Sequence, residues 1–179
     1  EQQPGADAGA QRGWRPPGAE GYRERRSGCG AGGVDSDQRG ADLGEQEDRL
    51  AVFDWVADLG APLSLLVNNA GGNQPAPTLA YRDDEYRAIF ELNLFSAFEM
   101  CRLAHPQLVQ HANAAIVNVG SVSGVTHVRT GSPYGMSKAA LHQLTRNLAA
   151  EWAAYGIRVN AVAPWYIRTQ RSEPALAND

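Results

Sequence analysis

Tyr134 and Lys138 are the pair whose residue types and spacing most clearly suggest chemistry. They lie four positions apart in a stretch with helical periodicity, so they share one helix face, one turn apart. A lysine ammonium beside a phenol favours the phenolate form, which makes Tyr134 a candidate general acid near neutral pH. The alternative is a chance pair in which Lys138, the only lysine of the chain, extends to water. The spacing alone leaves both interpretations open.

Three further polar features could belong to the same site. Ser121 follows an apolar run, and its hydroxyl could bind a substrate carbonyl or simply satisfy its own loop. Asn93 falls on or beside an apolar helix face, where an amide needs partners, so a structural and a functional role are both open. The turn 68–72 could admit a flat ligand or be only a tight turn. The four histidines show no ligand spacing, so no metal site is predicted.

The elements that position these residues are predicted from apolar periodicity. The chain should form helices over residues 45–60, 83–104 and 132–155, and short buried strands over residues 63–67, 114–119 and 157–162. We expect Asp83 or Asp84 to cap the second helix and Pro106 to prevent its continuation. Ser132 should be the N-cap of the third helix, with Pro133 at its first position.

Alternation of helix and strand is typical of an α/β domain with a parallel sheet and helices on its faces. Ligands of such sheets bind beyond the carboxyl ends of the strands. The loops over residues 68–72, 120–132 and 163–169 are therefore the expected location of the site.

Charge and composition exclude several classes of function. The chain of 179 residues has a net charge of −4, which gives no sign of nucleic acid or an anionic membrane as a partner. Its longest apolar runs fall far short of the ~20 residues of a membrane helix, and no signal peptide is readable. Cys29 and Cys101 form neither a disulfide framework nor a zinc site, which favours a reducing compartment such as the cytoplasm.

Residues 1–40 differ in character from the rest of the chain. They hold 10 of the 19 glycines and no Leu, Ile, Met or Phe, so they cannot form an apolar core. This segment is either a disordered arm or the product of a shifted reading frame in GC-rich coding DNA. Residues 28–33 match G-x-G-x-x-G literally, but no strand precedes the match and no helix follows it, so we reject it as a dinucleotide site.

From Ala41 to about Pro174 the chain resembles the short-chain dehydrogenase/reductase family. The shared features are Asp42, the Asn68-Asn69-Ala70-Gly71 turn, Asn93, Ser121 and the Tyr134-x-x-x-Lys138 pair. The His105-Pro106 and Glu151-Trp152 pairs and the 163–169 segment look most like the tropinone-reductase-like branch.

The resemblance implies a Rossmann-like doubly wound parallel sheet, a small-molecule carbonyl or alcohol substrate, and NADP or NAD as cofactor, with NADP favoured. It implies that Tyr134 donates the proton to the carbonyl oxygen, while Lys138 binds the nicotinamide ribose and assists Tyr134. Ser121 would polarise the carbonyl, and Asn93 would organise a water linked to Lys138. Tyr134 would also contact the cofactor. The other cofactor contacts would be Asp42 at the adenine, Asn69, Ala70 and Gly71 at the adenosine ribose, and Thr169 near the carboxamide.

The family pattern also begins and ends outside this sequence. The first βαβ unit with its phosphate-binding turn and the last strand have no counterpart, so residues 41–179 are expected to be an incomplete copy of the domain that binds NAD(P)H weakly or not at all. One alternative is therefore an inert, cofactor-free fragment; another is an epimerase or dehydratase that uses the same Tyr-Lys pair. Full-length members of the family form dimers or tetramers through the two long helices.

Overall fold

The computed structural model describes residues 40–167. Helices α1 (Gln46–Asp58), α2 (Asp83–Phe90), α3 (Ser96–Leu108) and α4 (Ser132–Trp152) alternate with strands β1 (Leu65–Asn68), β2 (Ala115–Val119) and β3 (Arg158–Val162). All six elements predicted from periodicity are present within a few residues of their expected bounds. The proposed boundary near residue 40, and both interpretations of the segment before it, concern residues outside this range and stay predictions.

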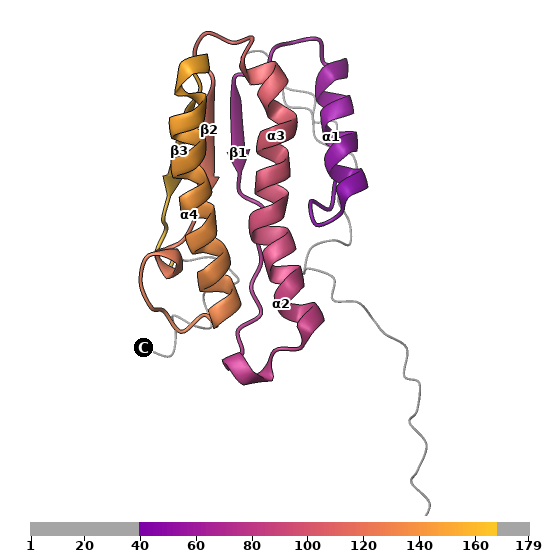
Figure 1. The fold of residues 1–179 in the computed structure, drawn as a ribbon. Coiled ribbons are helices and arrows are strands. Elements are labelled where there is room, and N and C mark those ends of the chain that lie inside the picture. The colour runs from indigo at the N-terminus through magenta and orange to yellow at the C-terminus, as the bar shows by residue number, and fades with distance from the viewer. Residues whose placement is uncertain (1–39, 168–179) are drawn as a thin grey trace, which may run out of the picture.

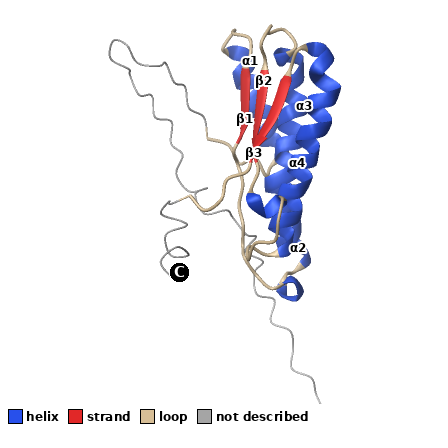
Figure 2. Cartoon of the chain, turned by 90° about the vertical axis from the view of Figure 1, so that its left-hand side faces the viewer, coloured by secondary structure: helices blue, strands red, loops and turns tan. Residues whose placement is uncertain are grey.

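The three strands form one parallel sheet in the order β1-β2-β3 (Figure 1). Helices α3 and α4 lie on one face of this sheet, and α1 packs against α3 (Figure 2). On the opposite face, Leu65, Val67 and Val162 are each about half exposed, and no helix of the described part of the chain covers them. The predicted α/β class with a parallel sheet is confirmed, as an incomplete sheet.

The core lies between the sheet and helices α3 and α4. Leu66, Ile116 and Val159 are partners in register on the three strands, and all three are buried. Fully buried side chains from α3, including Leu108, pack against this row. Because side chains alternate across a strand, the same register directs Asn68 and Asn118 toward the helices at the carboxyl end of the sheet.

The second predicted helix differs from expectation at both ends and in its middle. Arg82 is its N-cap residue rather than Asp83 or Asp84, and its backbone N–H donates to Glu85 Oε2 (3.0 Å). A π-helical turn over Glu91–Phe95 separates α2 from α3.

Helix α3 also continues past Pro106 to Leu108, so the expected end at that proline is wrong. Pro106 lies in the last turn of α3, so its missing N–H removes only one hydrogen bond of the helix. The burial of Leu108, which is fully buried, favours the helical path beyond the proline.

The third predicted helix begins with a different cap. Gly131, with φ 88°, precedes the first helical residue, so the prediction that Ser132 is the N-cap is wrong. The Ser132 hydroxyl instead bonds Thr78 Oγ1 (2.6 Å). A side chain at Gly131 would overlap the phenol oxygen of Tyr81, so this position favours glycine both for its backbone angle and for lack of space.

No helix within residues 40–167 is long and apolar enough to cross a bilayer.

Candidate active site

A cleft of about 600 Å³ opens at the carboxyl ends of the strands, where the parallel topology predicts it. Its walls come from the loops after all three strands and from the first two turns of α4. The cleft brings together five of the predicted site residues, which are Asn69, Gly71, Ser121, Tyr134 and Lys138.

Lys138 is buried and points toward the end of β2. Its Nζ donates to the Val119 carbonyl oxygen (2.8 Å) and lies 5.9 Å from the ring centroid of Tyr134. Burial lowers the pKa of Lys138 from 10.5 to about 8, because charge is disfavoured in a desolvated position. The alternative of a surface lysine extended to water is therefore wrong, since only 4% of Lys138 is exposed.

This lowered pKa makes a testable prediction about stability. Between pH 8 and 10.5 the unfolded chain holds a proton on Lys138 that the folded chain has lost. The free energy of unfolding should therefore rise with pH across this window, by up to about 3 kcal/mol. Urea unfolding of the unaltered chain and of Lys138→Met measures the difference between them, and identical pH profiles would contradict the prediction.

Asn93 sits in the π-helical turn and is 1% exposed. Its side chain forms a reciprocal pair with Gly72, because Oδ1 accepts from the Gly72 N–H (2.8 Å) and Nδ2 donates to the Gly72 carbonyl (2.8 Å). The same Nδ2 lies 3.2 Å from Ser137 Oγ on α4. Asn93 thus fixes the turn after β1 against α4. Its implied role with a water molecule stays a prediction.

A buried polar network lies directly beneath the cleft. Asn68 Nδ2 donates to Asn118 Oδ1 (2.8 Å), and Asn118 Nδ2 donates to Thr145 Oγ1 on α4 (2.9 Å). Asn68 also contacts the thiol of Cys101, whose pKa burial raises to about 12, so this thiol stays protonated. Hydrogen-bonded side chains from two strands and a helix thereby fix the strand ends from which the cleft loops depart.

Ser121 begins the turn after β2, and its Oγ accepts the backbone N–H of Ser123 (3.1 Å). The imidazole of His142 holds this turn from the side of α4, with Nε2 3.1 Å from the Ser121 carbonyl oxygen. A Cβ at Gly120 would overlap the imidazole, and one at Gly124 would meet it at 2.9 Å and the backbone of Lys138 at 2.6 Å.

His142 has no predicted part in the site, although its spacing indicates one. Tyr134, Lys138 and His142 follow one another at intervals of four residues, so one stripe of α4 carries all three. Arg129 is a second side chain of the cleft that sequence reasoning missed.

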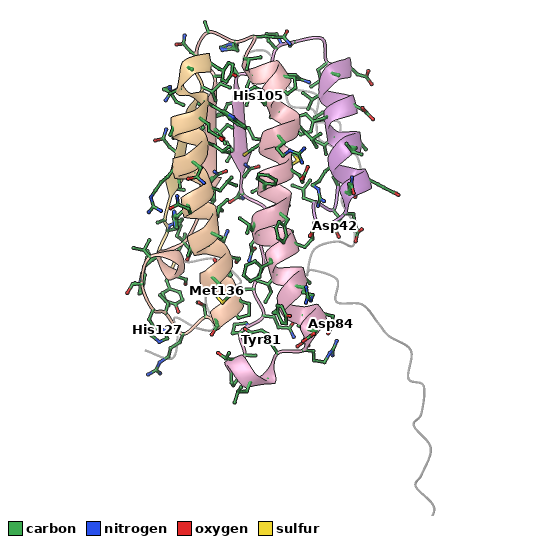
Figure 3. The ribbon with its side chains drawn as sticks, viewed as in Figure 1. Asp42, Tyr81, Asp84, His105, His127 and Met136 are labelled. Carbon is green, nitrogen blue, oxygen red and sulfur yellow. The ribbon has the colours of Figure 1, made fainter. Side chains whose placement is uncertain are left out.

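Three of the predicted cofactor residues are not part of this cleft. Ala70 is exposed beside it, and Asp42 lies in the segment before α1, far from the loop that carries His127 (Figure 3). The Asp42 carboxylate accepts the backbone N–H of Gly44 (3.0 Å). Thr169 lies outside the described residues. Residues 40–167 contain no cluster of three or more His, Cys, Asp or Glu side chains that could hold a metal ion.

The arrangement supplies the parts of an acid–base site. The half-buried phenol of Tyr134, the buried amine of Lys138 and the hydroxyl of Ser121 line one cleft. The pKa of the Lys138 amine is lowered, so it releases its proton more readily than an exposed lysine. Such a group of side chains can donate a proton to, or accept one from, an oxygen atom placed between the phenol and the serine.

Comparison with known proteins identifies the family. A family model described as short chain dehydrogenase matches residues 20–179. A tropinone reductase homolog of Arabidopsis thaliana is 43% identical over 136 residues, which cover 76% of this chain and 51% of the relative. Senescence-associated protein 13 of the same plant is 42% identical over 132 residues, covering 73% and 49%. The chain spans about half the length of these curated relatives.

Solved structures share the fold as well. The chain matches an NADP active-site complex of RhlG from Pseudomonas aeruginosa with a TM-score of 0.72 and 34% identity, over 78% of this chain and 56% of that one. It also matches a gluconate 5-dehydrogenase from Burkholderia cenocepacia in complex with NADP and tartrate, with a TM-score of 0.70 and 31% identity, over 77% and 54%.

Proposed function

Because the chain belongs to the short-chain dehydrogenase family, we propose that it carries the proton-transfer half of an oxidoreductase that interconverts a ketone and a secondary alcohol. The observation that carries this proposal is the meeting of Tyr134, Lys138 and Ser121 in one cleft. A nicotinamide cofactor, NADP or NAD, is part of the proposal, and both structural relatives described above were solved with NADP.

The residues of the cleft fit such a cofactor. A Cβ at Gly71 would come within 3.0 Å of Asn93 Oδ1 and 3.3 Å of Lys138 Nζ, so the bare backbone there lies against both side chains. The Lys138 ammonium uses one of its three donors on Val119, which leaves donors for ribose hydroxyls. When bound, the nicotinamide supplies the hydride to the carbonyl carbon or takes it from the alcohol carbon.

The side chains of this chain bind the carbonyl oxygen of the substrate and transfer a proton to it. The Ser121 hydroxyl donates a hydrogen bond to the carbonyl oxygen, and the Tyr134 hydroxyl transfers its proton to the same oxygen. Lys138 stabilises the phenolate that remains, and it holds the ribose in place. In the oxidative direction the phenolate accepts the alcohol proton, so one site serves both directions.

We also propose that the complete protein assembles through α3 and α4, in a cytoplasmic location. Phe95, Phe98 and Met136 are 47%, 39% and 58% exposed at the outer surface of this helix layer, which is apolar area that a second copy could cover.

The test is reduction of ketones by NADPH or NADH, measured as loss of absorbance of the reduced cofactor. It should be made on the complete protein that carries this sequence, and binding of each cofactor should be measured separately. Cofactor binding without turnover of any ketone or alcohol would overturn the oxidoreductase proposal. Epimerisation of a sugar, or elimination of water from a substrate, without net oxidation or reduction of the cofactor would favour the epimerase or dehydratase alternative.

His142 should act as a positioning residue for Ser121. His142→Leu removes the hydrogen bond to the Ser121 carbonyl and should lower kcat about 2- to 10-fold, the effect of one ordinary hydrogen bond. His142→Gln retains an amide donor and should recover most of this loss. KM for the cofactor should not change in either variant. Equal kcat values for the Leu variant and the unaltered enzyme, per folded molecule, would contradict this role.

A further inference from the structure

The cleft carries positive charge on a chain whose net charge is −4. Two of its lining side chains are basic, Lys138 and Arg129, and no Asp or Glu side chain lines it within the described residues. Lys138 is assigned above to the phenol and the cofactor. Arg129 has no role in that chemistry, so its place in the wall needs a separate explanation.

Arg129 stands on a turn that the structure holds in place. The neighbouring Thr130 carbonyl accepts from Asn73 Nδ2 (2.8 Å), and Thr130 Oγ1 lies 3.2 Å from Ser123 Oγ. The Thr130 N–H also donates to Val128 O (2.7 Å). These contacts tie the Arg129 turn to the segment after β1, through Asn73, and to the beginning of its own loop, through Ser123, although the Arg129 side chain itself is exposed.

The guanidinium of Arg129 is free to bind an anion. The ion pairs of the described residues use Arg49, Arg82 and Arg102, and none uses Arg129. Arg129 also lines a smaller cavity of about 240 Å³ next to the cleft, together with His127. The planar guanidinium binds a carboxylate through two parallel hydrogen bonds, a geometry that a lysine does not offer.

Part of the cleft wall is aromatic. Trp165 and Tyr166 both line it, with their rings in an edge-to-face contact at 5.4 Å between centroids. They are 58% and 45% exposed, so they present apolar surface to a ligand. The cleft therefore combines a proton donor for a carbonyl oxygen (Tyr134), an aromatic surface and the unpaired cation of Arg129.

Resting on the oxidoreductase function proposed above, we propose that the substrate is an oxo acid or hydroxy acid whose carboxylate binds Arg129 while its carbonyl faces Tyr134 and Ser121. The carboxylate is bound and leaves unchanged. A substrate bearing an ammonium group is disfavoured, because like charges repel in a cleft without an acidic side chain.

Three probes that differ in charge test this proposal. They are 4-acetylbenzoate, the neutral 4-acetylbenzamide and the cationic 4-acetyl-N,N,N-trimethylanilinium, and their binding is measured by calorimetry or ligand-observed NMR with and without NADPH. We expect the anion to bind about tenfold more tightly than the amide, with the cation weakest, and the preference to shrink as salt is raised. Arg129→Gln should abolish the preference. Arg146→Gln, which removes the same charge from the exposed surface of α4, should retain it.

The other outcomes overturn either the carboxylate site or the oxidoreductase function on which it rests, and the measurements tell the two apart. Equal binding of the anion and the amide, or binding of no probe, would exclude a carboxylate site at Arg129. Loss of NADPH affinity in Arg129→Gln would identify Arg129 as a ligand of a cofactor phosphate instead. Failure to reduce any probe while the charge preference persists would count against the oxidoreductase function alone, because binding is measured independently of turnover.

Discussion

Tyr134→Phe should lower the ketone reductase activity of the complete enzyme by about 10²–10⁴-fold or more, the usual contribution of a positioned proton donor. The phenylalanine keeps the ring that packs at the first turn of α4 and removes only the hydroxyl. Because most of the cofactor contacts proposed for this chain come from Lys138 and the Asn69–Gly71 turn, the Kd for NADPH should stay close to that of the unaltered enzyme.

Steady-state kinetics and a fluorescence titration with NADPH measure the two quantities. Tyr166→Phe is a matched control, because it removes a phenol from the same cleft at a position with no proposed part in proton transfer. If Tyr134→Phe retains more than a tenth of the activity, another group donates the proton. If NADPH binding is lost as well, the variant has disturbed the cleft and the kinetic loss cannot be assigned to the proton.

Lys138→Met should weaken cofactor binding and turnover together. Methionine has a similar length and can occupy the same buried position, but it cannot donate to ribose hydroxyls or stabilise a phenolate. Loss of hydrogen bonds from a charged donor should raise the Kd for the cofactor about 10- to 100-fold. A further loss in kcat at saturating cofactor would come from the missing partner of Tyr134.

The comparison of the two substitutions separates their roles. Tyr134→Phe should change kcat with little change in cofactor Kd, whereas Lys138→Met should change both. Normal coenzyme affinity in Lys138→Met would contradict the ribose role. A stopped-flow measurement of NADPH binding, followed by single-turnover reduction, distinguishes a binding defect from a chemical one.

Much of the fold could be predicted from the sequence because its signals are local. Apolar periodicity is set by neighbouring residues, so three helices, three strands and their parallel arrangement were predictable. The Tyr134 and Lys138 pair was also predictable as a pair, because a spacing of four residues places both side chains on one helix face whatever surrounds them.

Where the predictions failed, the reason was non-local. Ser132 has the ideal chemistry of an N-cap, but Thr78, more than fifty residues earlier, takes its hydroxyl, and Gly131 makes the turn. Pro106 normally ends a helix, but α3 continues two residues beyond it to the buried Leu108. In both cases contacts distant in sequence outweighed a local preference.

By itself, the sequence determined the class of fold, the order of its elements and the residue types available for proton transfer. Only the tertiary structure decided that Lys138 is buried on Val119, that His142 holds the Ser121 turn, and that Arg129 lines the same cleft without an ion-pair partner among residues 40–167. Burial and pairing depend on which loops meet at the carboxyl ends of the strands. That meeting is a consequence of parallel packing, and no spacing within a single helix or loop encodes it.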